Sequence, residues 1–210
     1  MNKRTNCILR WLIVCYCLPF SSCHKVKSDE IKVTITVKEY KTDKPIANAI
    51  VSITIGKNQI GTNLVATLTT NENGEAFYDE IVSTFDYNYY CQARKEGYID
   101  EGTQAPISIG KDKQKQVLTL YTESYVKLHV KNVNPFNQSD LISFNSACNT
   151  YTIAGTADST FLWCYDCDCK WYGNYNHTGG AFITKNGKDT TVHFNFETRP
   201  YDTITVNINY

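Results

Sequence analysis

Four cysteines in the last third of the chain have a spacing that could support shared chemistry. Cys164, Cys167 and Cys169 lie within six residues, and Cys148 is the one other cysteine after Cys91. In an exported protein, four thiols favour two disulfides, and the sequence cannot choose among the three possible pairings. Only one residue separates Cys167 from Cys169, so we expect each to pair elsewhere, with Cys148 as the partner of one of them.

A zinc site is the competing interpretation of the same four residues. Cys164 and Cys167 have the spacing of a zinc knuckle, and Cys148 and Cys169 could complete a tetrahedron of thiolates. We favour the disulfides and predict no metal and no cofactor. Cys91 lies in an apolar strand pattern, where a reduced thiol behaves as a small apolar side chain. We therefore expect Cys91 to stay reduced and buried.

The cysteine-rich segment is also rich in aromatic residues. Aromatic side chains with a polar tip are enriched where one surface binds another, and flat rings also stack on sugar faces. The alternative is that these rings cover the small core of a loop pinned by cysteines. The ligand-binding candidates, for a glycan or a protein, are Trp163, Tyr165, Trp171, Tyr172 and Tyr175.

The sequence shows neither a recognised catalytic motif nor a charge pattern for nucleic-acid binding. The HExxH, GxSxG, Walker and GxGxxG signatures are absent. Lys and Arg balance Asp and Glu at 21 each, so the chain has no basic footprint for nucleic acid. We predict a non-enzymatic protein that does not bind nucleic acid. The alternative is an exported metal-binding or enzymatic protein that uses the Cys164–Cys169 loop.

The N-terminal segment has the pattern of a signal peptide. Three cations precede an apolar run from Trp11 to Phe20, which is too short for a stable membrane span. Residues 20–23 read Phe-Ser-Ser-Cys and resemble the lipobox of bacterial lipoproteins. The resemblance implies that residues 1–22 are removed and that Cys23 is acylated, for example with palmitate. An ordinary cleaved signal with a coincidental cysteine is the alternative.

Residues 23–30 form a polar tether after the predicted anchor. The acidic pair Asp29-Glu30 resembles the export signal of Bacteroidota-type lipoproteins. That resemblance implies an outer-membrane location, held by the lipid and facing the cell surface, with the periplasmic face as the alternative. The membrane, bound through the N-terminal lipid, would then be one binding partner of the protein. The predicted function is a cell-envelope lipoprotein that displays β-sandwich domains for binding or assembly.

The elements that must position these residues are predicted to be strands. Val, Ile, Thr and Tyr are abundant, and apolar and polar residues alternate perfectly from Ile31 to Lys38. No stretch after Cys23 sustains a helical period. The fold class is therefore all-β, as two tandem Ig-like or prealbumin-like sandwiches. Further strands are expected at 49–55, 64–70, 75–80, 87–95, 106–109 and 116–121.

Residues 31–122 resemble the carboxypeptidase regulatory-like domain. The resemblance lies in TDKPIANAIVSI, TTNENGEAFY and YYCQARKEGYI. It implies a non-catalytic prealbumin-type sandwich and does not imply carboxypeptidase activity. Asn73-Gly74 suits a hairpin turn with positive φ.

A second sandwich is predicted for residues 123–210. Residues 122–124 are the expected boundary, because a complete strand is predicted on either side of them. Asn186-Gly187 predicts a hairpin, and the segment from Cys164 to Gly180 is expected to be a long loop. Three short motifs in this half resemble the O-glycosylation sequon of Bacteroidota-type exported proteins, with acceptors at Ser159, Thr190 and Thr203.

Overall fold

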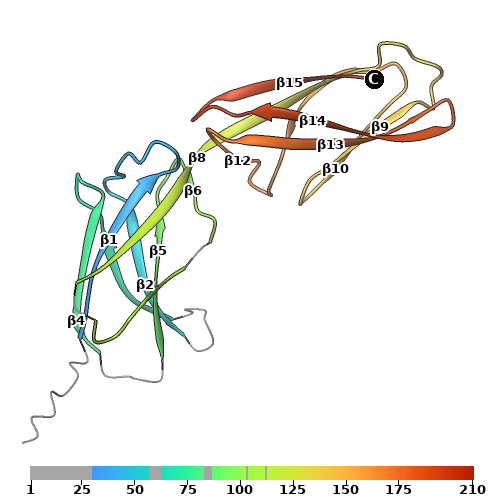
Figure 1. The fold of residues 1–210 in the computed structure, drawn as a ribbon. Coiled ribbons are helices and arrows are strands. Elements are labelled where there is room, and N and C mark those ends of the chain that lie inside the picture. Colours follow the sequence, from blue (N-terminus) through green and yellow to red (C-terminus); the bar gives the residue numbers. More distant parts are fainter. Residues whose placement is uncertain (1–29, 57–62, 83–86, 103, 112) are drawn as a thin grey trace, which may run out of the picture.

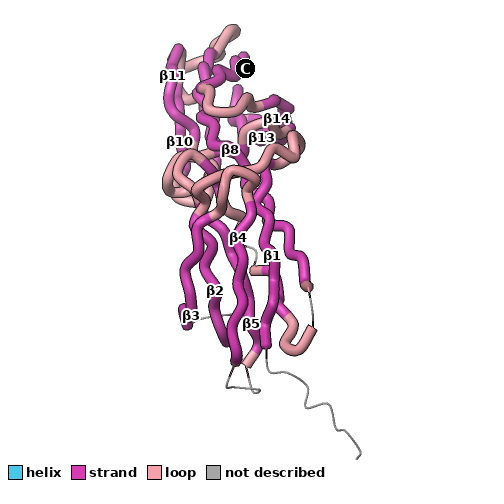
Figure 2. The backbone as a smooth tube through the Cα atoms, turned by 90° about the vertical axis from the view of Figure 1, so that its left-hand side faces the viewer, coloured by secondary structure: helices cyan, strands magenta, loops and turns pink. Residues whose placement is uncertain are grey.

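The computed structural model describes residues 30–56, 63–82, 87–102, 104–111 and 113–210. The described chain is built from strands and turns (Figures 1 and 2), which confirms the all-β fold class. None of the described residues forms a helix long and apolar enough to cross a membrane. The predicted signal peptide, Cys23 and tether residues 23–29 lie outside the described residues.

Two sheets pack face to face in the first sandwich. One contains β4 (Glu75–Ile81), β1 (Glu30–Glu39) and the first half of β8 (Gln114–Lys131), with β6 (Tyr98–Ile99) beside β8. The other has the order β3 (Asn63–Thr69), β2 (Ile50–Gly56), β5 (Asn88–Arg94) and β7 (Ala105–Ile107).

The first core follows from alternation along β1. Ile31, Val33, Ile35 and Val37 are at most 4% exposed, so the face predicted from the sequence is the buried one. The turn between β3 and β4 contains Gly74 at φ +71°, as expected for a primed or left-handed turn position. A Cβ atom there would lie 2.6 Å from the carbonyl oxygen of Val37. Gly74 therefore lets this turn lie directly against β1. The expected hairpin is wrong, because β3 pairs with β2 while β4 pairs with β1 in the facing sheet.

Side chains of β8 close the open edge of β7. Gln114 accepts a hydrogen bond from the Ser108 amide at 2.7 Å and donates one to the Ser108 carbonyl at 2.5 Å. Gln116 donates to the carbonyl of Pro106 at 2.6 Å. An uncovered strand edge is a template for pairing with another chain. The two glutamines occupy this edge and tie the two sheets of the first sandwich together.

One strand, β8, runs through both halves of the molecule (Figure 1). It pairs in parallel with β1 through residues 114–120 and in parallel with β15 (Thr203–Asn209) through residues 125–131. The strands expected at 116–121 and from 125 are thus one continuous strand that includes residues 122–124. The division of the chain into two domains stays a prediction.

The second sandwich is built around the distal half of β8. β11 (Asp158–Trp163) and β15 flank β8, and β12 (Trp171–Tyr172) pairs with it at residues 123–124. The facing sheet has the order β10 (Thr150–Ala154), β9 (Leu141–Asn145), β13 (Asn176–Lys185) and β14 (Lys188–Glu197). A second hydrophobic core lies between these sheets.

Two buried hydroxyl residues separate the cores along β8. Leu120 belongs to the first core and Val126 to the second, and all even-numbered positions between them are buried. Those positions are Thr122 and Ser124, which are at most 2% exposed. The Ser124 hydroxyl donates to the carbonyl of Asp202 at 3.1 Å. β8 therefore continues without a break at the point where its buried side chains pass from the first core to the second.

The expected loop from Cys164 to Gly180 is shorter than the sequence indicated. β12 interrupts it at Trp171–Tyr172, and β13 begins at Asn176. A search for alternating apolar and polar residues misses these two strands, because β12 has two residues and the start of β13 contains two glycines. The hairpin at Asn186-Gly187 is confirmed, since both residues have positive φ, at 51° and 66°.

Candidate functional site: a disulfide-framed cavity and a tyrosine strip

All four cysteines of the second half are oxidised, as predicted. Cys148 pairs with Cys167, and Cys164 pairs with Cys169. The first bond joins the turn between β9 and β10 to the loop after β11, and the second closes that loop on itself. Since every sulfur of the set is in a disulfide, the structure does not show the zinc alternative. Among the described residues, Cys91 is the free, buried thiol, and burial raises its pKa to about 12.

The loop after β11 is shaped by its own aspartate. Asp166 Oδ1 accepts hydrogen bonds from the amides of Asp168 at 3.1 Å and Lys170 at 3.0 Å. Cys169 follows with a φ of 60°, which turns the chain back toward β12. In the facing turn, the Ser146 hydroxyl accepts from the amide of Asn149 at 3.1 Å. Both turns therefore have hydrogen bonds of their own in addition to the disulfide.

These two turns border a cavity of about 500 Å³. One wall is the turn at 145–147, the other is the loop at 164–166, and the start of β13 at 177–180 completes the lining. Because Cys148–Cys167 links the two walls, we call this the disulfide-framed cavity. Trp163 and Trp171 also line it.

The two tryptophans serve mainly as core residues. Trp163 is 4% exposed and Trp171 is 3% exposed, and their ring centroids lie 4.7 Å apart. The indole N–H of Trp171 donates to the carbonyl of Trp163 at 2.7 Å. A Cβ atom at Gly179 would lie 2.8 Å from the Trp163 ring, so glycine makes room for that ring. Of the five aromatic candidates, these two therefore match the interpretation that the rings cover a core.

His177 lies beside the tryptophans in its neutral form. Burial lowers the pKa of His177, so the ring is uncharged at neutral pH. Its Nε2 lies 2.9 Å from the carbonyl oxygen of Tyr172, which can only accept, so Nε2 carries the proton. The ring stacks on Phe196 with centroids 5.3 Å apart. Sequence reasoning placed His177 in a loop and missed this role.

The three tyrosine candidates form a strip with two tyrosines of the first sandwich. From Tyr165, 50% exposed, ring contacts lead to Tyr172 at 5.9 Å, then to Tyr121 at 4.6 Å and to Tyr40 at 4.3 Å. Tyr175 lies 5.9 to 6.2 Å from Tyr172, Tyr40 and Tyr121. We call these five residues the tyrosine strip. It crosses from one sandwich to the other.

Polar contacts fix the same junction. Lys170 donates to Glu123 at 2.5 Å, and the Glu123 side chain is only 14% exposed. The Tyr98 hydroxyl donates to Glu39 at 3.1 Å, and its ring meets Tyr201 edge to face at 5.9 Å. Burial, with a smaller effect of a hydrogen bond to Glu101, raises the pKa of Tyr121, so its hydroxyl is uncharged at neutral pH. The rings, the Lys170–Glu123 ion pair and the Tyr98–Glu39 hydrogen bond thus reinforce the continuous strand β8.

Sequence reasoning missed Tyr40 and Tyr121. Tyr40 follows the last residue of β1, and Tyr121 precedes the expected boundary, so neither carries a local signal of a site. Parallel pairing of β1 with β8 places Glu39 opposite Leu120, which brings the two tyrosines side by side. Only that long-range pairing could have identified them.

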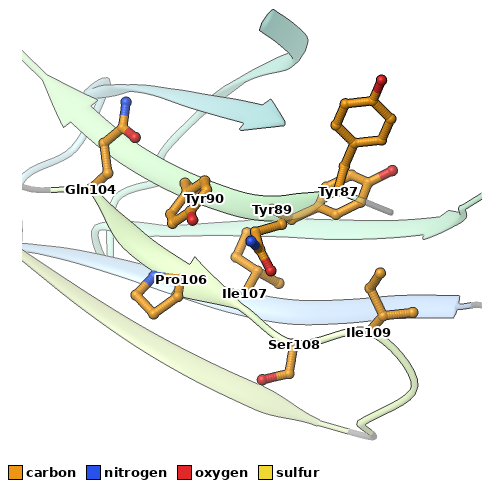
Figure 3. Close-up of a pocket in the computed structure, with 9 residues that line it drawn as sticks. Tyr87, Tyr89, Tyr90, Gln104, Pro106, Ile107, Ser108 and Ile109 are labelled. Carbon is orange, nitrogen blue, oxygen red and sulfur yellow. The ribbon is translucent and has the colours of Figure 1, made fainter. Parts of the chain in front are cut away.

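A second cavity, of about 680 Å³, lies in the first sandwich beside β5 and β7. Figure 3 shows Tyr87, Tyr89 and Tyr90 on the β5 side, with Pro106 on the neighbouring strand. Pro106 is directly opposite Tyr90 in the ladder. Tyr89 and Tyr90 are each 5% exposed, so the two rings are packed rather than presented to a ligand. We therefore place the candidate site in the second sandwich.

The predicted glycan acceptors lie on strands of the second sandwich. Ser159 on β11 is half-buried, while Thr190 on β14 and Thr203 on β15 are exposed. Their modification stays a prediction, as does the lipid at Cys23.

Comparisons with known proteins return low similarity. No protein-family model and no curated protein match the chain. The TIE protein of Bacillus anthracis has 14% identity and a TM-score of 0.37, with 86% of this chain and 34% of that one covered. A streptococcal ancillary pilin has 12% identity and a TM-score of 0.38, with 87% and 62% covered. The shaft pilin SpaA of Lactobacillus rhamnosus GG has 12% identity and a TM-score of 0.37, with 86% and 97% covered.

The chain thus spans about a third of the Bacillus anthracis protein and 62% of the streptococcal one. Identity this low does not place the chain in a family. The resemblance of residues 31–122 to the carboxypeptidase regulatory-like domain accordingly stays a prediction.

Proposed function

We propose that the protein is a non-enzymatic cell-envelope lipoprotein that presents a binding surface on its second sandwich. In this proposal Cys23 carries the lipid, residues 23–30 are the tether, and the outer membrane bears the protein with its sandwiches facing outward. The ligand at the surface is a glycan or a protein. The observation that carries the proposal is the fixed junction between the two sandwiches, where β8 and the tyrosine strip meet.

The geometry supports display at a distance from the membrane. β1 begins at Glu30, the last residue of the tether, and ends beside Tyr40 in the tyrosine strip. Ten residues of strand span about 33 Å, so the first sandwich acts as a spacer between anchor and site (Figures 1 and 2). A spacer with a swivelling joint would not hold the site in one orientation. The shared strand and the stacked rings remove that freedom.

The chemistry of the surface supports binding more than reaction. Tyr165, Tyr172 and Tyr175 offer rings and hydroxyl groups, and the adjacent cysteines are in disulfides. Rigid aromatic side chains give a large contact area at a small entropy cost. The alternative, a metal-binding or enzymatic protein, would need the cysteines of residues 164–169 as thiolates. That alternative predicts stoichiometric zinc and chelator-sensitive activity in purified protein.

The anchor is tested with two cysteine variants of the full chain in a host that processes lipoproteins. Cys23→Ala should abolish membrane association, while the matched control Cys17→Ala, in the apolar run, should not. Acyl chains contribute about 0.8 kcal/mol per buried CH₂, and stable anchoring takes more than one chain. Mass spectrometry should find acyl chains on mature wild type, and protease added to intact cells should digest both sandwiches. Cys23→Ala protein in the membrane fraction, together with wild type free of lipid, would refute the anchor.

A further inference from the structure

The disulfide-framed cavity has the dimensions and rigidity of a small-molecule site. Its volume of about 500 Å³ lies inside the usual range of roughly 300–1,000 Å³ for ligand pockets. Cys148–Cys167 holds the turn at 145–147 against the loop at 164–166, so the two walls keep their separation without a ligand. Preorganisation of this kind lowers the ordering cost of binding.

Aromatic and polar groups meet in the lining. Trp171 lies behind Tyr165, with ring centroids 5.2 Å apart, and Tyr165 is the ring that solvent reaches. Among the described residues, no hydrogen bond reaches the Tyr165 hydroxyl, the Asn145 amide nitrogen or Asp166 Oδ2. A ligand here would therefore find one flat apolar face beside several unpaired polar groups of both donor and acceptor type.

The charge of the lining restricts the ligand further. None of the described residues that line the cavity is Lys or Arg, and Asp166 brings a carboxylate. The nearby Lys170 is held by Glu123. His177 adds no positive charge, because it is neutral. An anion would meet repulsion with no compensating cation, while a purely apolar ligand would leave the polar groups unsatisfied.

We propose that the disulfide-framed cavity binds a neutral pyranose ring, with one face of the sugar stacked on Tyr165 and its hydroxyl groups bonded to Asn145 and Asp166. A pyranose has an apolar C–H face and a hydroxyl edge, which match the two kinds of group in the lining. The inference rests on the binding role proposed above and names the ligand class of that site.

Tryptophan fluorescence offers a readout specific to this cavity. The chain has three tryptophans, and two of them, Trp163 and Trp171, line the cavity. The full chain carrying Trp11→Phe therefore reports from this site alone. The probes are glucose, galactose, mannose and N-acetylglucosamine, with glucuronate as the anionic comparator and a capped aromatic dipeptide as the protein-like comparator. Lipid attachment and location do not enter the assay, so failure of the membrane proposal would leave its result unchanged.

We expect a saturable fluorescence change with at least one neutral sugar and at least tenfold weaker binding of glucuronate. Tyr165→Ala should weaken sugar binding by about tenfold or more, in the range for a truncated aromatic anchor. The matched control is Tyr201→Ala, since Tyr201 is similarly exposed at 57% but lies outside the cavity. Tyr165→Phe, which keeps the ring, should lose less than Tyr165→Ala.

Three outcomes would overturn the inference. The first is that no neutral sugar of the set gives a saturable change. The second is that glucuronate or the dipeptide binds as well as the best sugar. The third is equal binding by the Tyr165→Ala and Tyr201→Ala chains, which would separate the signal from the proposed stacking face.

Discussion

Removal of the Cys148–Cys167 disulfide should destabilise the second sandwich by about 3 kcal/mol. Both cysteines are exposed, so their replacement by serine removes a chain constraint and almost no packed core. They are 19 positions apart in sequence. In the chain-entropy model, a closed loop of about 20 residues contributes about 3 kcal/mol to the free energy of unfolding.

The assay is equilibrium unfolding in urea, followed by tryptophan fluorescence in the Trp11→Phe chain. Trp163 and Trp171 both belong to the second core, so the signal reports that sandwich. The variant Cys148→Ser, Cys167→Ser should have a lower midpoint, and the free-energy difference follows by linear extrapolation.

The matched control changes the exposed neighbours of the same two cysteines. Asn149→Ser, Asp168→Ser alters both turns and leaves the disulfide in place. We expect this control to stay within about 0.5 kcal/mol of wild type, as is usual for surface substitutions. A loss below about 1 kcal/mol in the cysteine variant, or an equal loss in the control, would refute the view that the bond acts through chain entropy.

Three further predictions follow from single contacts. Gly179→Ala should lower the midpoint of thermal unfolding, because its Cβ would lie 2.5 Å from the Phe194 ring and 2.8 Å from the Trp163 ring; an unchanged midpoint in calorimetry would show that these rings can move. Hydrogen bonds to Asn207 and Asp158 raise the pKa of His129. The stability that these bonds contribute is therefore complete below the pKa of the unfolded state and is lost as pH rises through the pKa of the folded state. NMR titration should give a midpoint above about 6.5, and Asp158→Asn should lower it. Because burial raises the Cys91 pKa to about 12, its thiol should resist alkylation at pH 8 until the chain unfolds, as peptide mapping would show.

Much of the fold could be predicted because period-two alternation records burial directly. Ile31, Val33, Ile35 and Val37 fill the predicted face of β1, and Asn186-Gly187 forms the predicted turn. β9 was missed, although Ile142 and Phe144 on it are fully buried. Its five residues offer two buried positions, which is too short a pattern to distinguish from a turn.

The site could be predicted only in part, because its geometry comes from contacts between distant residues. The oxidation of the four cysteines follows from their number and setting, but their pairing depends on where β9 and β11 end. The packing of Trp163 requires a residue without a Cβ at Gly179, which has no local pattern of its own. Tyr121 belongs to the tyrosine strip because β8 continues past residue 122 into the second sandwich.

The parallel pairing of β1 with β8 also determines how the protein would carry load. If Glu30 is tethered and the second sandwich holds a fixed ligand, tension pulls β1 toward its start and β8 toward its end. The two strands are parallel and paired over seven positions, from Val33 with Gln114 to Glu39 with Leu120. Opposed pulling along parallel strands shears their evenly spaced hydrogen bonds together rather than opening them one by one. Under tension, detachment would then depend on the rate at which this ladder ruptures as a unit.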